Sequence, residues 1–189
     1  MVNILKRCLC LFSVLICVMP APSHAMSIED AYKAIPKEQT PYDANNSPLN
    51  APDAEYLSAF FITLDYAVAL RVELLTAMLN DQFYDMDYFQ QAYLGIIQDL
   101  QSMPTPHKHY ETQRLVLEAL REQWAFFEEW HYADYQMKSI YRSYNSQPKV
   151  KSSSRKLIMA YNLFLQAYPN ESPWNKKAFY NHLCALDFI

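Results

Sequence analysis

A single glycine, Gly95, is present in this chain of 189 residues. Glycine-rich phosphate-binding loops, dinucleotide-binding fingerprints and nucleophile elbows each need several positions without a side chain, so the sequence excludes all three. Tight β-hairpins are disfavoured as well, because their preferred turns need residues with positive φ. Abundant Ala, Leu, Glu, Gln and Met, with prolines gathered at segment boundaries, predict an all-α fold.

Residues 1–25 have the three parts of a cleavable signal peptide in the right order. Lys6 and Arg7 form a positively charged start, and Ser23-His24-Ala25 places small residues at both positions that a signal peptidase reads. The uncharged apolar stretch between them, 8–19, is shorter than the roughly 20 residues that span a bilayer, which disfavours an N-terminal membrane anchor. We therefore expect cleavage after Ala25 and a periplasmic or secreted mature protein.

Cleavage at this position leaves one cysteine, because Cys8, Cys10 and Cys17 precede it and only Cys184 follows. A single thiol cannot form an internal disulfide. Cys184 lies among leucine and alanine residues, so we expect it to be a small buried hydrophobic residue. No base partner is indicated by spacing, which argues against a catalytic thiol.

The mature chain, 26–189, has a length typical of one domain. The apolar spacing in 53–80 follows i, i+3/i+4 without a miss, and it predicts a long helix buried on more than one side. Further helices are expected over 27–35, 85–101 and 107–144, then from the serines 152–154 to Pro169, and after Ser172. Short connections make sequential helices antiparallel, so we expect an up-and-down bundle of four to five helices with an extended Pro-rich loop at 36–52.

Histidines and glutamates supply only weak metal-site candidates. Glu128 and His131 have the Glu-x-x-His spacing of di-metal helical bundles, but no second such pair exists in the chain. His107 and His109 form an incomplete zinc-like pair at a predicted helix start. Since no haem-attachment motif is present either, we expect no cofactor, and a metal- or haem-binding bundle with a redox or enzymatic role is an alternative hypothesis.

Arg71 falls in the middle of the predicted 53–80 helix, beside apolar positions. Burying a guanidinium is costly without a partner, so we expect it to pair with a carboxylate of another helix. A functional anion site around Arg71 is the alternative interpretation.

Charge is divided unevenly along the chain. Residues 26–137 carry six basic and eighteen acidic side chains, a balance of −12, whereas residues 138–189 carry eight basic and two acidic ones, a balance of +6. In an antiparallel bundle, the end of the 107–144 helix and the start of the next share one pole. The side chains expected to meet there are Lys138, Arg142, Lys149, Lys151, Ser152, Ser153, Arg155 and Lys156.

Cations, serine hydroxyls and free amides at a helix start suit a phosphate or similar anion. The leading hypothesis is therefore an exported, non-enzymatic binding protein that recognises an anionic, phosphorylated lipid headgroup through this basic pole. The competing interpretation is that the basic segment only neutralises the acidic helices. Nucleic acid is not an expected partner, because the protein is exported and acidic overall.

Tyrosines suggest one further kind of partner. The chain has fifteen of them, all after residue 25. Tyrosine suits the edges of cores and also protein interfaces, since its ring is apolar and its hydroxyl reaches water. A structural or chaperone-like interaction module with tyrosine-rich faces is therefore the third hypothesis.

Overall fold

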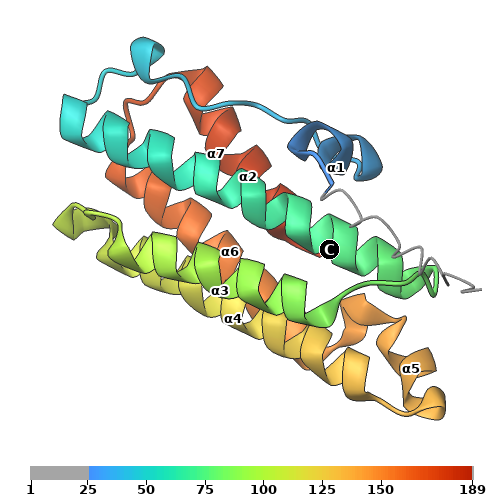
Figure 1. Ribbon diagram of the computed structural model, residues 1–189. Coiled ribbons are helices and arrows are strands. Elements are labelled where there is room, and N and C mark those ends of the chain that lie inside the picture. The colour runs from blue at the N-terminus through green and yellow to red at the C-terminus, as the bar shows by residue number, and fades with distance from the viewer. Residues whose placement is uncertain (1–25, 189) are drawn as a thin grey trace, which may run out of the picture.

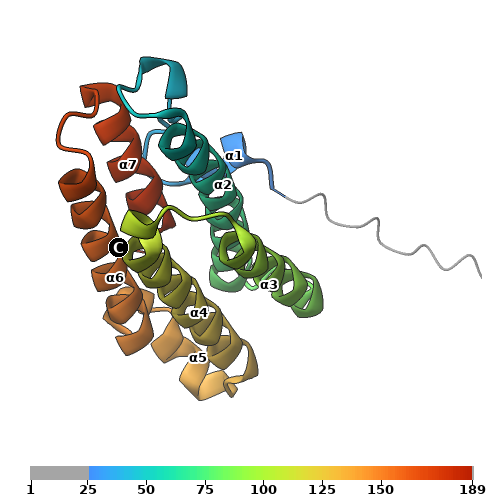
Figure 2. The same ribbon diagram turned by 90° about the vertical axis from the view of Figure 1, so that its left-hand side faces the viewer.

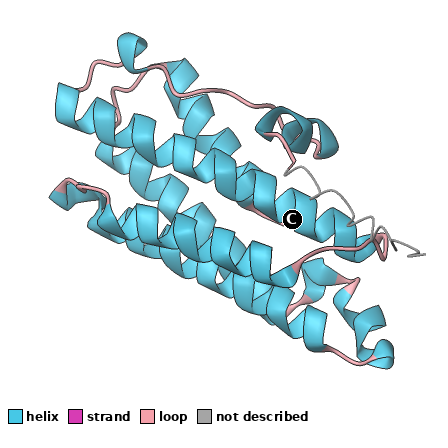
Figure 3. Cartoon of the chain, viewed as in Figure 1, coloured by secondary structure: helices cyan, strands magenta, loops and turns pink. Residues whose placement is uncertain are grey.

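The computed structural model describes residues 26–188, and every regular element in that range is helical (Figure 1). Figure 3 shows helices joined by loops, without a strand in the described part of the chain. The predicted all-α class is confirmed. The predicted signal peptide, 1–25, lies outside the described residues.

Seven α-helices and three short 3-10 helices follow one another within residues 26–188. They are α1 (Ile28–Ala34), η1 (Ala44–Asn46), α2 (Ala51–Leu79), α3 (Met86–Ser102), η2 (His107–His109), α4 (Tyr110–Tyr132), α5 (Tyr135–Tyr141), η3 (Tyr144–Ser146), α6 (Pro148–Ala167) and α7 (Pro173–Leu186). No helix among these residues is both long and apolar enough to cross a membrane.

Helix α2 lies at the centre of the packing, in contact with α1, α3 and α7, whereas α4 packs most extensively on α6 (Figure 2). Buried residues occur around most of the circumference of α2, as the dense apolar spacing predicts. Phe61 of α2 illustrates the core. Its ring contacts Phe60 of the same helix, Phe164 of α6 and Phe179 of α7, each at a centroid distance of 5.5 Å. Such aromatic clusters contribute large buried area and favourable ring geometry.

The end of α2 shows how a chain with one glycine terminates a long helix. Asn80 is the C-cap, and Asp81 follows with a φ of 51°, the left-handed conformation that glycine usually provides. The Gln82 amide then donates to the Ala77 carbonyl at 2.9 Å, which closes a Schellman-type turn. Aspartate tolerates this conformation better than most residues because its short side chain is polar.

The expected single helix over 107–144 is wrong, because the structure breaks it between Tyr132 and Tyr135. Ala133 is extended, and the Asp134 carboxylate accepts a hydrogen bond from the Met137 amide at 2.8 Å, which starts α5 as a separate helix. The change of direction returns Tyr141 to the core, where its ring lies 5.9 Å from Phe126. Met137, on α5, is exposed.

The expected start of the next helix at the serines 152–154 is also wrong. Helix α6 begins at Pro148, whose ring occupies the first turn, where a missing N–H costs nothing. Val150 is fully buried in that turn. The serines therefore lie inside the helix. The free amides of the helix start are those of Lys149 and Val150, because Pro148 has no N–H and the Lys151 amide donates to the Gln147 carbonyl at 3.0 Å.

The Pro-rich segment before α2 lies against α7 and is held there by side chains. Asn175 bonds to both the amide and the carbonyl of Asp43 at 2.9 Å, and the Trp174 Nε1–H donates to the Pro41 carbonyl at 3.0 Å. The Asn181 amide also donates to Thr40 Oγ1 at 2.6 Å. These contacts satisfy backbone groups that an extended segment leaves without partners.

Candidate functional site

The corner where α4, α5 and α6 meet carries the predicted basic pole. Lys138 lies on α5 and Arg142 caps its C-terminal end, while the four remaining cations lie on the first turns of α6. The helix break at 133–134 therefore decides how Lys138 and Arg142 are presented. The structure brings these residues to neighbouring elements, but it gives them different partners.

Three of the six cations form ion pairs with acidic side chains. Arg142 contacts Asp81 at 2.6 Å and also donates to the Leu79 carbonyl, and it thereby covers the C-terminal end of α2. Lys149 pairs with Glu129, and Lys156 with Glu122 of α4. Because these pairs are at least partly exposed, each contributes little to stability.

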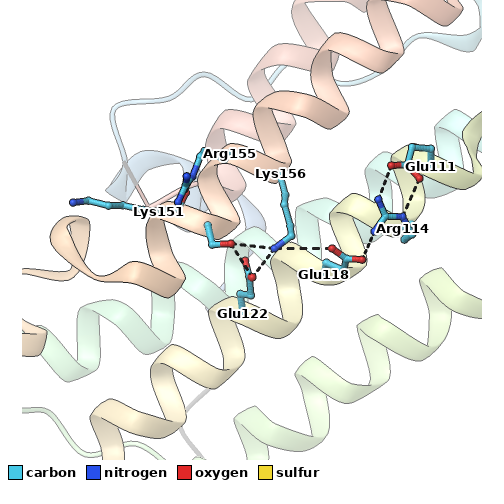
Figure 4. A network of polar contacts seen from close by, with 8 residues as sticks. Glu111, Arg114, Glu118, Glu122, Lys151, Arg155 and Lys156 are labelled. Atoms are coloured by element: carbon cyan, nitrogen blue, oxygen red, sulfur yellow. Dashed lines mark hydrogen bonds and ion pairs between the residues drawn. The ribbon is translucent and has the colours of Figure 1, made fainter.

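Both predicted serine ligands also have partners on α4. Ser152 Oγ donates to Glu122 Oε1 at 2.9 Å, beside the Lys156 ammonium (Figure 4). Ser153 is fully buried and accepts a hydrogen bond from Gln123 Nε2 at 3.1 Å. The Ser153 hydroxyl is therefore part of the α4–α6 interface rather than of an open anion site.

Lys151 and Arg155 differ from the other cations of α6. Figure 4 shows both side chains directed away from the Glu122–Lys156 contacts. Within residues 26–188 neither forms an ion pair, and both are exposed; the Arg155 Nε–H donates to the Lys151 carbonyl. Lys138 is likewise exposed on α5.

Apolar side chains continue the exposed face that Lys151 and Arg155 begin. Ile158 and Met159 are 54% and 53% exposed, and their spacing of three and four residues places them on the same side of α6. We call these four residues the α6 outer strip: Lys151, Arg155, Ile158 and Met159. Two cations followed by two large apolar side chains form a surface that is both basic and hydrophobic.

The weak metal candidates lie apart from one another. His131 Nδ1 is 3.0 Å from the Tyr84 hydroxyl, and its neighbour on the helix, Glu128, is half-buried. His107 is exposed against Tyr110, whereas His109 is fully buried. In the described part of the chain, no three His, Cys, Asp or Glu side chains are grouped so that they could hold a metal ion.

His109 belongs to a buried polar cluster that the sequence did not indicate. Its Nε2 contacts the Tyr168 hydroxyl, its ring stacks on Tyr56 at 4.8 Å, and its Nδ1 has no hydrogen-bond partner among the described residues. Lys108 pairs with the buried Asp53 and lies 4.5 Å from the centre of the Tyr168 ring. Burial, together with the adjacent Lys108 charge, lowers the pKa of His109 to about 4.

A second buried cluster joins α1, α2 and α7 and was also missed. Asp65 accepts a hydrogen bond from the Tyr32 hydroxyl at 2.7 Å, and His182 Nε2 lies 3.2 Å from the same carboxylate. The other ring nitrogen of His182 lies 2.8 Å from the Ala178 carbonyl, which can only accept. Burial, followed by the Asp65 charge, raises the pKa of Tyr32, so its hydroxyl remains a donor.

Arg71 is buried, as expected, and its partners are on α7. Its Nη2 donates to the Ala185 carbonyl at 2.7 Å. Burial lowers the pKa of Arg71, and the nearby charge of Asp187, the C-cap of α7, partly opposes this shift. Cys184, on the same helix, is half-buried, and burial raises the pKa of its thiol. A raised pKa leaves less of the reactive thiolate at neutral pH.

No family model matches the chain, and no curated protein or solved structure is significantly similar to it. The geometry of the described residues therefore supplies the basis for a functional proposal.

Proposed function

We propose that the protein is an exported, non-enzymatic helical binding protein that associates with an anionic lipid surface through the α6 outer strip. The observation that carries this proposal is the unpaired, outward-facing state of Lys151 and Arg155 beside exposed Ile158 and Met159. Interfacial helices bind membranes by this combination, in which cations attract anionic headgroups and apolar side chains enter the headgroup layer. The predicted signal peptide at 1–25 supports action beyond the cytoplasmic membrane.

The proposal also includes the organisation of the mature chain. We infer that residues 26–189 form one domain, an up-and-down bundle of four to five helices, on which the short helices α1 and α5 are additions. A rigid bundle holds the α6 outer strip in place, because the opposite face of α6 packs on α4 and α7. Lys149, Lys156 and Arg142 then support that face through their ion pairs and do not contact lipid.

Vesicle co-sedimentation tests the proposal with phosphatidylglycerol-containing vesicles and neutral phosphatidylcholine vesicles. The double variant K151Q/R155Q is expected to reduce partitioning onto the anionic vesicles roughly 25-fold, at about 1 kcal/mol for each cation near the surface. The variant I158Q/M159Q is expected to weaken partitioning at low and at high salt. High salt is expected to remove the effect of K151Q/R155Q, because exposed charges are screened.

The matched control is R142Q/K149Q, which changes the net charge by the same amount but removes two paired cations. It is expected to leave vesicle binding within about twofold of the wild type. Equal binding to anionic and neutral vesicles, or equal losses in K151Q/R155Q and in R142Q/K149Q, would overturn the proposal.

A further inference from the structure

The Arg71 guanidinium lies in the interior with only part of its hydrogen-bonding capacity used. Arg71 is 3% exposed, and its Nε has no hydrogen-bond partner among the described residues. The Phe188 ring lies 5.4 Å from the guanidinium carbon and covers one side of it. A buried cation with an unused donor is less favourable for stability than an apolar residue of similar volume, so its presence points to an anion that completes the site.

A cavity of about 380 Å³ adjoins Arg71. It lies between the end of α1 and the following segment, the C-terminal half of α2, η3 and the end of α7. Most of its lining is apolar, including Val72, Leu75, Leu79 and Phe188. A largely apolar cavity with a few convergent polar groups is typical of small-molecule sites, and this volume lies at the lower end of their range.

The charged groups that line the cavity are Lys37, Arg71 and Asp187, a balance of one positive charge. Asp187 also accepts a hydrogen bond from Ser154 at 2.7 Å, so its carboxylate is held in place beside the cavity. A doubly charged phosphate would meet repulsion from this carboxylate. A singly charged carboxylate matches this balance, and the Arg71 guanidinium and the Lys37 ammonium are the two cations that line the cavity beside it.

We propose that this cavity binds a monocarboxylate with a hydrocarbon chain, its carboxylate between Arg71 and Lys37 and its chain against the apolar wall of α2. At roughly 30 Å³ for each heavy atom, the cavity holds a ligand of about a dozen heavy atoms. A medium-chain fatty acid meets both requirements. The site is separate from the α6 outer strip, so it stands or falls independently of the proposed lipid-surface binding.

Isothermal titration calorimetry of the purified protein with octanoate, octan-1-ol and acetate tests the proposal. Octanoate is expected to bind with one molecule per chain. Octan-1-ol keeps the chain and loses the charge, and acetate keeps the charge and loses the chain, so each is expected to bind at least about tenfold more weakly.

Two cation variants locate the carboxylate. R71M is expected to weaken octanoate binding roughly tenfold or more, and K37Q about threefold, because Lys37 is only half-buried. K33Q is the matched control, since Lys33 lies on the preceding helix but pairs with Glu29 at 2.8 Å outside the cavity. The vesicle-binding variant K151Q/R155Q is expected to bind octanoate as the wild type does.

A34W keeps the test decisive if R71M does not fold. Ala34 is exposed and lines the cavity, so a tryptophan there fills the space without entering the core. A59W, at an exposed alanine of α2 beside a different cavity, is its control. Octanoate binding is expected to be lost in A34W and retained in A59W. Absence of octanoate binding to the wild type, equal binding of octan-1-ol, or unchanged binding in both K37Q and A34W would overturn the proposal.

Discussion

Polar side chains in this protein meet in two very different settings. Along the α4–α6 surface, cations and carboxylates such as Lys149 and Glu129 pair in contact with water. Beneath α1 and between α2 and α7, fewer polar groups meet in the interior, with Asp65, Tyr32 and His182 as the clearest set. Most charged residues of the sequence belong to the surface. Exposed ion pairs nevertheless contribute little to stability, because water and salt screen them.

The buried polar groups, by contrast, contribute strongly to stability through their partners. Each lost its hydration when the chain folded, so removing one partner leaves another polar atom without compensation. We therefore expect substitutions in the interior to change the free energy of unfolding by several times more than substitutions of the surface pairs. Three measurements test this contrast, beginning with the largest effect.

D65A is expected to lower the free energy of unfolding by about 3 kcal/mol or more, since Tyr32 and His182 both lose their carboxylate partner. Urea unfolding followed by far-UV circular dichroism measures this change. E129A, which removes an exposed carboxylate of α4 paired with Lys149, is the control and is expected to cost less than about 1 kcal/mol. Equal effects of D65A and E129A would remove the distinction between the two settings.

Acid should act through His109. Its pKa is about 4 in the folded chain and about 6.5 when unfolded, so between these values the unfolded chain binds a proton that the folded chain does not. The stability present above pH 6.5 is therefore lost as the pH falls toward 4, by up to about 3 kcal/mol.

The measurement compares free energies of unfolding at pH 7 and pH 4.5 for the wild type, H109Q and H107Q. The difference between the two pH values is expected to shrink in H109Q and to stay unchanged in H107Q, because His107 is exposed. A full pH dependence in H109Q would assign the acid sensitivity to other groups.

The smallest effect is expected for the Lys149–Glu129 pair. A double-mutant cycle with K149Q and E129Q should give a coupling below about 1 kcal/mol that decreases further at high salt. A coupling as large as the effect of D65A would mean that the surface pairs contribute as much as the interior clusters.

Helix ends show where sequence reasoning succeeded and where it did not. The helix starts at Ser27 and Ser172 were predicted from local residue types. Each serine side chain accepts a hydrogen bond from the backbone amide three residues later, as an N-cap does. The break at Asp134 was not predicted, because Trp130, Met137 and Tyr141 keep an apolar periodicity through it. Local capping by Asp134 and the return of Tyr141 to the core outweigh that periodicity.

The candidate sites, too, were predicted only in part from the sequence. The sequence indicated the cations of α6 and the unusual position of Arg71, since both follow from charge and helical spacing. It did not indicate that Lys149 and Lys156 have partners on α4 while Lys151 and Arg155 face outward. Nor did it indicate the His109 and Asp65 clusters, whose members lie up to 150 positions apart in the chain, from Tyr32 to His182.

By itself, the sequence determined the helical class, through a lone Gly95, regular apolar spacing and prolines at the boundaries. These are local properties, because helix formation depends on residues three and four positions apart. The tertiary structure decided which charges are paired, which are buried and which remain exposed. Those outcomes depend on contacts between distant segments. A lysine forms a structural ion pair or remains available to bind a ligand according to whether a carboxylate lies within about 4 Å of its ammonium group.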